Sequence, residues 1–405
     1  MSAWRFVVWF GVVAMLADVV YEGARSITGP LLAHLGASAL VVGVVTGVGE
    51  AAALVLRLVS GPLADRTRGF WAWTIAGYAI TVVSVPLLGL TSVLWVAAGL
   101  VVAECVGKAV RSPAKDTLLS HATAVTGRGR GFAVHEALDQ VGALTGPLLV
   151  AAVLALTGDD YGPALVMLAV PGALALGLVV WLRVKVPHPA RYELGPAGTE
   201  TARGPRQTLA GADRLPPTFW VYAVFAGLTM TGFATFGVLS FHLVTAGLLT
   251  AAAVPVLYAV AMVVDAVAAV ATGWGYDRYG ASVLIGLPVV AALVPALAFS
   301  TTLGLAVLGV LAWGAALGVQ ESTLRATVAD LVPPGRRATA YGVLGAVVGA
   351  GAAAGGALAG GLYDVSVALL VAVTVVLQGL ALTLLVVTLR RAAVDSATHR
   401  PGDPT

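Results

Sequence analysis

The sequence has few charged residues for its length. Only 11% of its 405 residues are Asp, Glu, Lys or Arg, against roughly a quarter in an ordinary soluble domain, while 59% are hydrophobic. A soluble chain of this length could not cover its surface with so few charges, so lipid must be the solvent for most of it. The sequence therefore predicts a multi-pass membrane protein.

Three further shortages exclude other classes of protein. The single cysteine, Cys105, excludes an intrachain disulfide, and the complete lack of Asn removes every N-glycosylation acceptor. Aromatic residues make up only 7% of the chain, so no aromatic cage for a ligand can be drawn. No metal-ligand spacing and no nucleophile–base arrangement occurs. We therefore expect no cofactor, no metal and no enzymatic activity.

Long apolar runs dominate the sequence. A membrane-spanning helix needs about 20 mainly apolar residues, and twelve such runs occur, six on either side of a proline-rich polar stretch. The first six lie at about 4–28, 38–60, 71–90, 93–111, 131–157 and 162–184, and the second six at about 218–244, 247–272, 281–299, 302–324, 338–362 and 365–389. We predict an all-α fold of two pseudo-symmetric six-helix bundles, at 1–187 and 218–391, with a linker at 188–217 and a polar tail at 392–405.

The positions of Lys and Arg predict the orientation of the chain. Nearly all of those outside the apolar runs fall in loops on one side of the predicted bundle, in the linker or in the tail, while Arg25 lies towards the other side. Positive residues accumulate on the cytoplasmic side of membrane proteins. Both termini and the linker are therefore expected to be cytoplasmic, in a protein of the cytoplasmic membrane.

Short motifs recur at equivalent places in the two halves. The charged stretch Gly61–Gly69 follows the second run, and Gly273–Gly280 follows the eighth; both are predicted to be turns. Glycines suited to close helix packing also repeat, at Gly142 and Gly146 before Pro147 in the fifth run and at Gly351 and Gly355 in the eleventh. Two parallel halves of six helices are typical of transporters, whose site lies between the halves near the middle of the membrane.

These motifs resemble those of the major facilitator superfamily of secondary transporters, over nearly the whole chain. Gly61, Asp65, Arg66 and Gly69 resemble the signature loop of the family, and Gly273, Asp277 and Arg278 resemble its weaker second copy. The resemblance implies alternating access, with these charged motifs acting as gates that pair and release. The motif at Gly142, Gly146 and Pro147 is similar to that of the antiporters of the family.

One departure from the family pattern concerns the fourth run. Drug–proton antiporters of the family usually carry an arginine there, ahead of a glycine. This chain has Glu104 and Lys108 instead. A coupling mechanism that depends on that arginine therefore does not transfer to this sequence.

Ionisable and polar residues inside the apolar runs are the candidates for binding substrate and protons, because they are costly in a bilayer and by default face the protein interior. The candidates are Asp18, Glu22, Arg25, Glu50, Glu104, Lys108, His135, Glu136, Asp139, Asp265 and Gln320. Structural pairing is the alternative for several of them. Glu22 could pair with Arg25, and Glu104 with Lys108, within single helices, and Glu321 with Arg325 likewise.

The fifth run carries the most informative group. His135 and Asp139 share a helix face, and Glu136 lies beside them. A carboxylate beside a histidine in a low-dielectric cavity can exchange a proton near neutral pH. The equivalent positions of the second half hold only apolar residues or Gly, so the internal repeat does not require this group. Asp139 is therefore the main candidate for proton coupling.

Together these features predict a proton-coupled secondary transporter of a small organic solute, acting in efflux as an antiporter. Acids outnumber bases within the apolar runs, which favours cationic or neutral solutes. Import by proton symport is one alternative, and a receptor or lipid-handling protein on the same scaffold is another. The expected partners are a small-molecule solute, protons and the lipid bilayer, with no nucleic acid, and the chain is expected to be a monomer.

Overall fold

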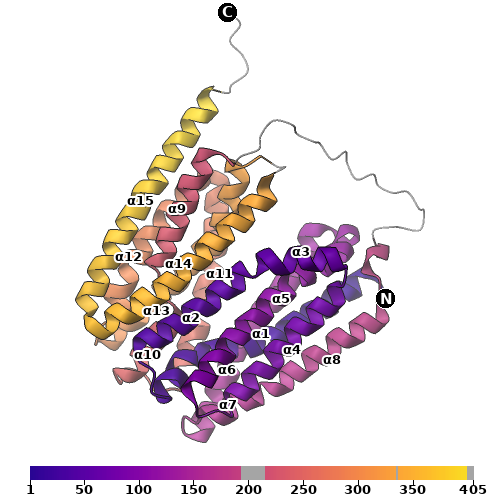
Figure 1. The fold of residues 1–405 in the computed structure, drawn as a ribbon, viewed down its shortest axis with the longest axis horizontal. Coiled ribbons are helices and arrows are strands. Elements are labelled where there is room, and N and C mark those ends of the chain that lie inside the picture. Colours follow the sequence, from indigo (N-terminus) through magenta and orange to yellow (C-terminus); the bar gives the residue numbers. More distant parts are fainter. Residues whose placement is uncertain (193–214, 334–335, 399–405) are drawn as a thin grey trace, which may run out of the picture.

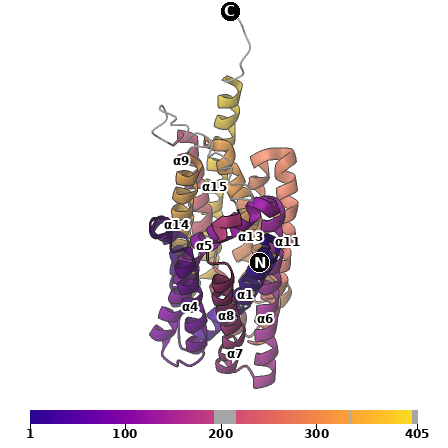
Figure 2. The same ribbon diagram turned by 90° about the vertical axis from the view of Figure 1, so that its right-hand side faces the viewer.

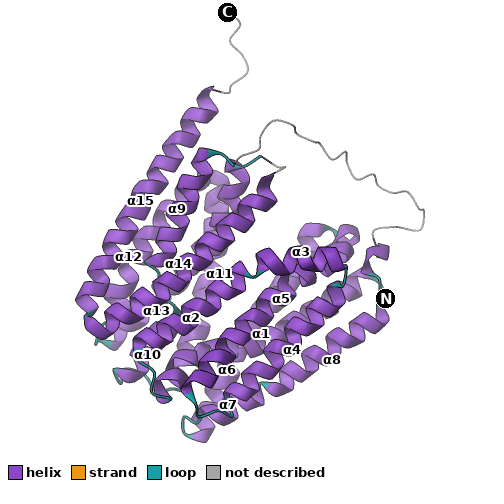
Figure 3. Ribbon diagram, viewed as in Figure 1, coloured by secondary structure: helices purple, strands orange, loops and turns teal. Residues whose placement is uncertain are grey.

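The described part of the chain is almost entirely helical. The computed structural model describes residues 1–192, 215–333 and 336–398, and these ranges contain no β-strand (Figure 3). The first half consists of α1 (Ala3–His34), α2 (Ala39–Val55), α3 (Arg57–Thr67), α4 (Phe70–Leu88), α5 (Leu94–Thr126), α6 (Arg128–Thr157), α7 (Tyr161–Met167), α8 (Ala169–Lys185) and the short 3₁₀ helix η1 (Pro189–Tyr192). The second half consists of α9 (Pro217–Thr231), α10 (Phe236–Thr245), α11 (Ala253–Tyr279), η2 (Gly280–Ile285), α12 (Gly286–Ala298), α13 (Leu303–Leu331), α14 (Arg337–Val365) and α15 (Val367–Thr398).

These helices supply the twelve membrane crossings that the apolar runs predict. Ten helical segments of the described chain are long and apolar enough to cross a bilayer. One of them, Ala253–Ala298, has 46 residues, enough for two crossings, because only η2 separates α11 from α12. The remaining crossing is α5, whose apolar stretch contains Glu104, Lys108 and Arg111. The fold is therefore two six-helix bundles, as predicted.

Three crossings that the sequence predicts as continuous are each divided into two helices. The break between α7 and α8 falls at Leu168, where Pro171 has no N–H group to donate to the carbonyl of Met167. A second break at Leu56 separates α2 from α3. The third is the largest, because residues 232–235 between α9 and α10 are not helical.

The charged motifs predicted as turns are mostly helical. α3 continues through the motif at 61–69 as far as Thr67, and the chain turns at Arg68, whose φ of 52° is left-handed. α11 continues through the motif at 273–280 and stops at Gly280, whose φ is 61°. The turn prediction was wrong over most of each motif, because one left-handed residue at its end is enough to terminate the helix.

Two helices extend beyond their predicted spans. α5 continues past residue 111, the predicted end, to Thr126, so Arg111 lies inside the helix. α15 continues past Arg391 to Thr398, so the first residues of the predicted tail are helical. Linker residues 193–214 and tail residues 399–405 lie outside the described residues.

The two bundles touch at one end and diverge towards the other. In Figure 1 the indigo-to-magenta bundle and the orange-to-yellow bundle approach each other at the lower left and separate towards the upper right. In Figure 2 the orange-to-yellow helices extend above those of the first half. The main contacts between the bundles are α2 with α14, α1 with α10, and α6 with α11. We call the end that carries the start of α1 and the end of α15 the linker end, and the opposite end, with Ser38 and Val365, the closed end.

Small residues and short hydrogen bonds seal the closed end. Gly43 of α2 and Gly356 of α14 pack so closely that a Cβ atom on either would overlap the carbonyl oxygen of the other. The hydroxyl groups of Thr46 and Thr235 are hydrogen-bonded across the two halves, with their oxygens 2.8 Å apart. The carboxylate of Asp364 accepts N–H groups at the start of α2, including that of Leu40 at 3.0 Å. Close backbone approach of this kind is how helices associate in lipid.

Replacing Gly356 tests whether this contact holds the closed end together. We expect Gly356→Val to separate α2 from α14, because overpacking a tight contact costs about 1–3 kcal/mol. Spin labels at Ser38→Cys and Val365→Cys, in a Cys105→Ser background, measure the separation. Their distance distribution should shift to longer values.

The matched control for this experiment is Gly345→Val, on the same helix. A Cβ atom at Gly345 meets no atom within 4 Å, so this variant should leave the distance unchanged. An unchanged distance in Gly356→Val, or an equal change in the control, would show that the glycine contact does not determine closure.

Candidate functional site

A cavity lies between the two bundles and extends towards the linker end. Its volume is about 820 Å³, within the range of roughly 300–1,000 Å³ for small-molecule sites. The first half contributes residues of α1, α2, α3 and α5, including Tyr21, Glu50 and Lys108, and the second half contributes α9, the segment after it, α13 and α14. The cavity therefore occupies the place that the twofold organisation of the sequence predicts for a transport site.

The non-helical segment 232–235 lies on the cavity wall. Ala234 and Thr235 line the cavity. The carbonyl of Ala234 accepts a hydrogen bond of 3.0 Å from Nε1 of Trp313, and that of Thr229 accepts one of 2.9 Å from Nε2 of Gln378. Irregular backbone at membrane depth persists only where it is buried in protein or lines a cavity, and broken helices of this kind mark transporter sites.

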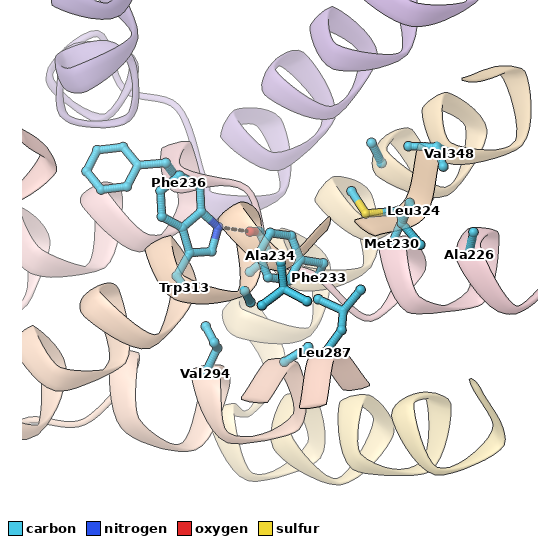
Figure 4. Close-up of a cluster of buried hydrophobic side chains, with 14 of the residues drawn as sticks. Ala226, Met230, Phe233, Ala234, Phe236, Leu287, Val294, Trp313, Leu324 and Val348 are labelled. Atoms are coloured by element: carbon cyan, nitrogen blue, oxygen red, sulfur yellow. Dashed lines mark hydrogen bonds between the residues drawn. The ribbon is translucent and has the colours of Figure 1, made fainter. Parts of the chain in front are cut away.

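The wall from the second half is mainly apolar. Figure 4 shows Met230 of α9, Phe233 of the non-helical segment and Trp313 of α13 together, below the ribbons of the first half. The rings of Phe233 and Trp313 are stacked, with centroids 6.1 Å apart and an angle of 12° between their planes. Val348 of α14 extends the same surface. This wall suits the apolar part of an organic solute.

The wall from the first half is charged. Arg25 of α1 forms an ion pair with Glu50 of α2 and lies 4.0 Å from Glu22 on its own helix. The Tyr21 hydroxyl accepts a further bond of 3.3 Å from Arg25. Glu22 also accepts a hydrogen bond from the Tyr258 hydroxyl of α11, which links the two halves. The predicted Glu22–Arg25 pair is therefore present, but Glu50 is the closer partner of Arg25.

Glu104 lies in a small pocket that adjoins the cavity. This pocket shares Tyr21, Arg25, Glu50 and Thr235 with the cavity and reaches α5 at Glu104. Glu104 is buried, and its Oε1 atom has no hydrogen-bond partner in the described part of the chain. The Cys105 thiol, 3.6 Å from the other oxygen, is a weak donor.

Lys108 takes a partner outside its own helix. The sequence offers Glu104 as an intrahelical partner, but no ion pair of these two residues within 4 Å occurs among the described residues. The Lys108 Nζ atom instead lies 3.7 Å from the centroid of the Tyr21 ring, a cation–π contact. Glu104 is therefore left without a bonded cation.

Asp18 and Asp139 belong to a polar network inside the first half. The two acids are close enough for each charge to act on the other, and the charge of Lys115 also acts on Asp139. Arg111 is buried, lies 3.8 Å from Asp18 and donates a hydrogen bond of 3.1 Å to Thr81. Neither acid lines the cavity. Arg111 was missed as a candidate because the sequence places it at the predicted end of its span.

The other candidates of α6 and α11 also lie outside the cavity lining. His135 is buried next to Phe10, and neither ring nitrogen has a hydrogen-bond partner among the described residues. Glu136 is exposed and accepts a 3.5 Å hydrogen bond from Gln140. Asp265 is buried against α13, and its Oδ1 atom has no partner in the described chain.

Three charged residues nearer the linker end complete the cavity. Arg57, Glu321 and Arg325 line it, as does the candidate Gln320. Glu321 and Arg325 form no ion pair within 4 Å in the described chain, although their spacing allows one. Among the described residues, four bases (Arg25, Arg57, Lys108 and Arg325) and two acids (Glu50 and Glu321) therefore line the main cavity. The surplus of acids counted over the apolar runs does not hold inside the cavity, because Asp18, Asp139 and Asp265 lie elsewhere.

The motif residues lie away from the cavity. Asp65, Arg66, Asp277 and Arg278 are exposed at the linker end, where the two bundles are apart, while Gly61, Gly69 and Gly273 are half-buried there. No ion pair of these four charged residues within 4 Å occurs in the ranges that the structure describes.

The glycine motifs lie at helix contacts within each half. A Cβ atom on Gly142 or Gly146 of α6 would overlap backbone atoms of α1, including the carbonyl oxygen of Val19. Pro147 follows directly in the same helix. On α14, Gly351 and Gly355 approach the backbone of α9 equally closely, and Gly355 also approaches Phe233 of the unwound segment. Glycine is required at these positions because no larger residue fits.

Comparison with known proteins agrees with this geometry. The sequence profile described as Major Facilitator Superfamily matches residues 10–356. An uncharacterised protein of Mycobacterium tuberculosis (strain ATCC 25618 / H37Rv) is 61% identical over 385 residues, which cover 95% of this chain and 93% of the relative.

Two solved structures share the fold. The nucleoside transporter NupG superimposes with a TM-score of 0.72 at 15% identity, covering 95% of this chain and 98% of NupG. A bacterial homologue of the human lysosomal transporter Spinster, in an inward-facing and occupied conformation, superimposes with a TM-score of 0.68 at 16% identity, covering 95% of this chain and 96% of the homologue.

The Arg25–Glu50 pair allows a test of the charged wall. We expect Glu50→Gln to destabilise the protein by roughly 1–3 kcal/mol, because Arg25 then lacks its main counter-ion in a partly buried site. Thermal unfolding in detergent should show a fall of a few degrees in Tm. The double variant Arg25→Gln, Glu50→Gln should recover most of the loss, since no charge is left unpaired. A double variant less stable than Glu50→Gln would contradict the pairing.

Proposed function

Since the chain belongs to the Major Facilitator Superfamily, we propose that it is a secondary transporter that exports a small organic solute from the cytoplasm in exchange for protons. It works by alternating access in the cytoplasmic membrane. Both termini and the linker are cytoplasmic in this proposal, as the distribution of Lys and Arg predicts. The cavity then faces the cytoplasm in the present conformation, and the closed end faces outwards.

The observation that carries the proposal is a cavity between two bundles that are joined at one end only. The contacts at the closed end are reversible, since they consist of glycine packing and of hydrogen bonds such as Thr46–Thr235 and Glu22–Tyr258. Rocking of one bundle against the other would exchange these contacts for new ones at the linker end. There the exposed charges of Asp65, Arg66 and Arg278 are available to pair, which supports their role as gates.

Glu104 supports the coupling to protons. A buried carboxylate without a counter-ion is costly, and it is relieved by taking up a proton or by meeting a cation. Glu104 lies in the pocket that adjoins the cavity, so its charge is felt by any bound solute. The Asp18–Asp139 pair is a second place for a proton, because two adjacent carboxylates cannot easily both be ionised.

The close packing of α6 on α1 supports efflux as the direction. Gly142 and Gly146, together with Pro147, form the motif that is similar to that of antiporters, and they hold Asp139 of α6 beside Asp18 of α1. A proton that binds to Asp18 or Asp139 would change the charge at the contact between α1 and α6. If that change drives the rocking that carries solute across the membrane, protons and solute are exchanged by one conformational change.

Import by symport is the second candidate, and the charge of the cavity favours it. Bases outnumber acids on the cavity wall. Neutralising Glu104 with a proton would remove a negative charge near a bound anion, so a proton and an anion would bind together more tightly than either alone. Positive coupling of this kind is what symport requires.

Proton movement in reconstituted vesicles distinguishes these functions. Vesicles that contain the full chain and a pH-sensitive dye are exposed in turn to a library of small organic solutes. For antiport, a solute added outside should drive protons out of the vesicles and make their interior more alkaline. For symport, the same addition should make the interior more acidic. Lipid transfer without any solute-driven proton movement would instead indicate a lipid-handling protein.

Removing the carboxyl groups tests the coupling directly. We expect Glu104→Gln to abolish solute-driven proton movement while exchange of solute down its own gradient persists, because the variant keeps the cavity but cannot release a proton. Asp139→Asn should reduce the coupling in the same way.

The control for these variants is Asp160→Asn, an exposed acid that caps α7 at the closed end and that Asn can replace as a cap. It should behave as wild type. Full proton-driven transport in Glu104→Gln would exclude Glu104 from the coupling, and the same result in Asp139→Asn would exclude Asp139.

A further inference from the structure

We infer that the solute is an amphipathic organic anion, whose carboxylate or phosphate group binds between Arg57 and Arg325 while its apolar part packs on the wall at Met230 and Phe233, behind which Trp313 is buried. The inference rests on the proposed function in one respect, that the cavity between the bundles holds the solute. It adds the charge of the solute, its shape and the side chains that select it.

Arg57 is a cation without a partner on the first-half wall. It is the first residue of α3, directly after the break at Leu56, and it lines the cavity. The Nε atom is buried and has no hydrogen-bond partner, and no ion pair of Arg57 within 4 Å occurs among the described residues. A guanidinium group in this state carries donors that a ligand can use.

Arg325 faces Arg57 from the opposite half. It lies on α13, lines the same cavity and is exposed to it. The positive charge of Arg325 acts on Arg57, as does that of Arg111, and the acid that opposes them is the exposed Asp116 of α5. Two like charges that face each other across a cavity are mutually destabilising. An anion between them would replace the repulsion with two sets of charge-assisted hydrogen bonds, for which guanidinium is the preferred donor.

The other charges of the cavity do not cancel this pair. Glu50 is engaged by Arg25, so neither contributes much net charge to a ligand. Lys108 lies over the Tyr21 ring and adds a further positive charge. Glu321 is then the one acid of the main cavity that has no ion pair among the described residues. Even when Glu104 of the adjoining pocket is counted, four bases face three acids among the described lining residues, so the field inside the cavity is positive and concentrates anions.

The apolar wall of the cavity would bind the apolar part of the solute. Met230, Phe233 and Trp313 line the cavity from the C-terminal bundle (Figure 4). Trp313 is fixed by its hydrogen bond to Ala234 and by stacking on Phe233, so the wall is rigid. Burial of apolar surface against it would stabilise a solute that also carries a charge at one end.

A purely structural role for the two arginines makes a different prediction. If Arg57 and Arg325 serve only to fix topology or to pair with acids when the linker end closes, anions should have no specific effect on the open protein. Binding to the purified full chain therefore separates the two roles without any transport measurement.

The test uses three aromatic probes that share one ring and differ in charge: benzoate, phenyl phosphate and benzyltrimethylammonium. Thermal unfolding is followed against each probe, with sodium chloride at equal ionic strength as the reference. We expect benzoate or phenyl phosphate to raise Tm with a saturable dependence on concentration, and benzyltrimethylammonium to have no effect. The better of the two anions identifies the carboxylate or the phosphate as the preferred group.

Variants connect the effect to the two arginines. Arg57→Gln and Arg325→Gln should each weaken the apparent affinity for the anion about tenfold or more, and Arg57→Lys should weaken it less because the charge remains. Arg183→Gln, which removes an exposed arginine outside the cavity near the end of α8, should bind like wild type.

Three outcomes would overturn the inference. They are stabilisation by benzyltrimethylammonium alone, no saturable effect of any probe, and equal anion binding in wild type and in the two Gln variants. Anion binding by a protein that moves no protons would leave the inference standing and refute the proposed coupling. Proton movement driven only by cationic solutes would support the proposed coupling and refute the inference.

Discussion

The cost of holding charge inside a protein whose solvent is lipid governs the arrangement of this structure. A charged side chain within the bilayer needs a partner or water, and otherwise it is expelled or neutralised. The first half carries most of these charges, and three of its bases are stabilised by different partners. Arg25 pairs with Glu50, Arg111 pairs with Asp18, and Lys108 lies on the Tyr21 ring.

Three of the charged residues that have no ion pair among the described residues carry the functional account. Glu104 is buried in the pocket beside the cavity, and Arg57 and Arg325 line the cavity from opposite bundles. The second half supplies most of the apolar surface and the non-helical segment 232–235, and its charged residues on the cavity wall are Glu321 and Arg325. The two bundles have thus diverged in chemistry while they keep one fold. A ligand that bridges the bundles would meet Arg57 of the first, and both Arg325 and the apolar surface of the second.

Much of the fold could be predicted from the sequence, because hydropathy records contact with lipid residue by residue. The twelve crossings and the two bundles follow from it. The break at residues 232–235 could not be predicted from hydropathy, since the freed carbonyl groups accept hydrogen bonds from Trp313 and Gln378 of distant helices. Arg111 was missed because hydropathy ends the span at residue 111, whereas α5 continues through Pro113 beyond the length that a bilayer requires.

Pairing of charges was the least predictable part of the site. Helical spacing allows Lys108 to pair with Glu104, but Lys108 instead makes a cation–π contact with Tyr21 of another helix. The acids of the apolar runs also do not gather in one place, since Asp139 lies inside the first bundle and Asp265 lies against α13. Spacing along one helix shows which pairs can form, whereas the packing of several helices decides which pairs do form.

The central claim, that the two bundles rock about the cavity in response to protons, can be tested by measuring distances at both ends of one protein. Spin labels at Val125→Cys and Tyr279→Cys, both exposed near the linker end, would report on that end in a Cys105→Ser background, and labels at Ser38→Cys and Val365→Cys would report on the other. The account predicts that a change of pH shortens the first distance and lengthens the second in the same proportion of molecules. A single unchanging distance at each end across the pH range, or changes at one end alone, would contradict it.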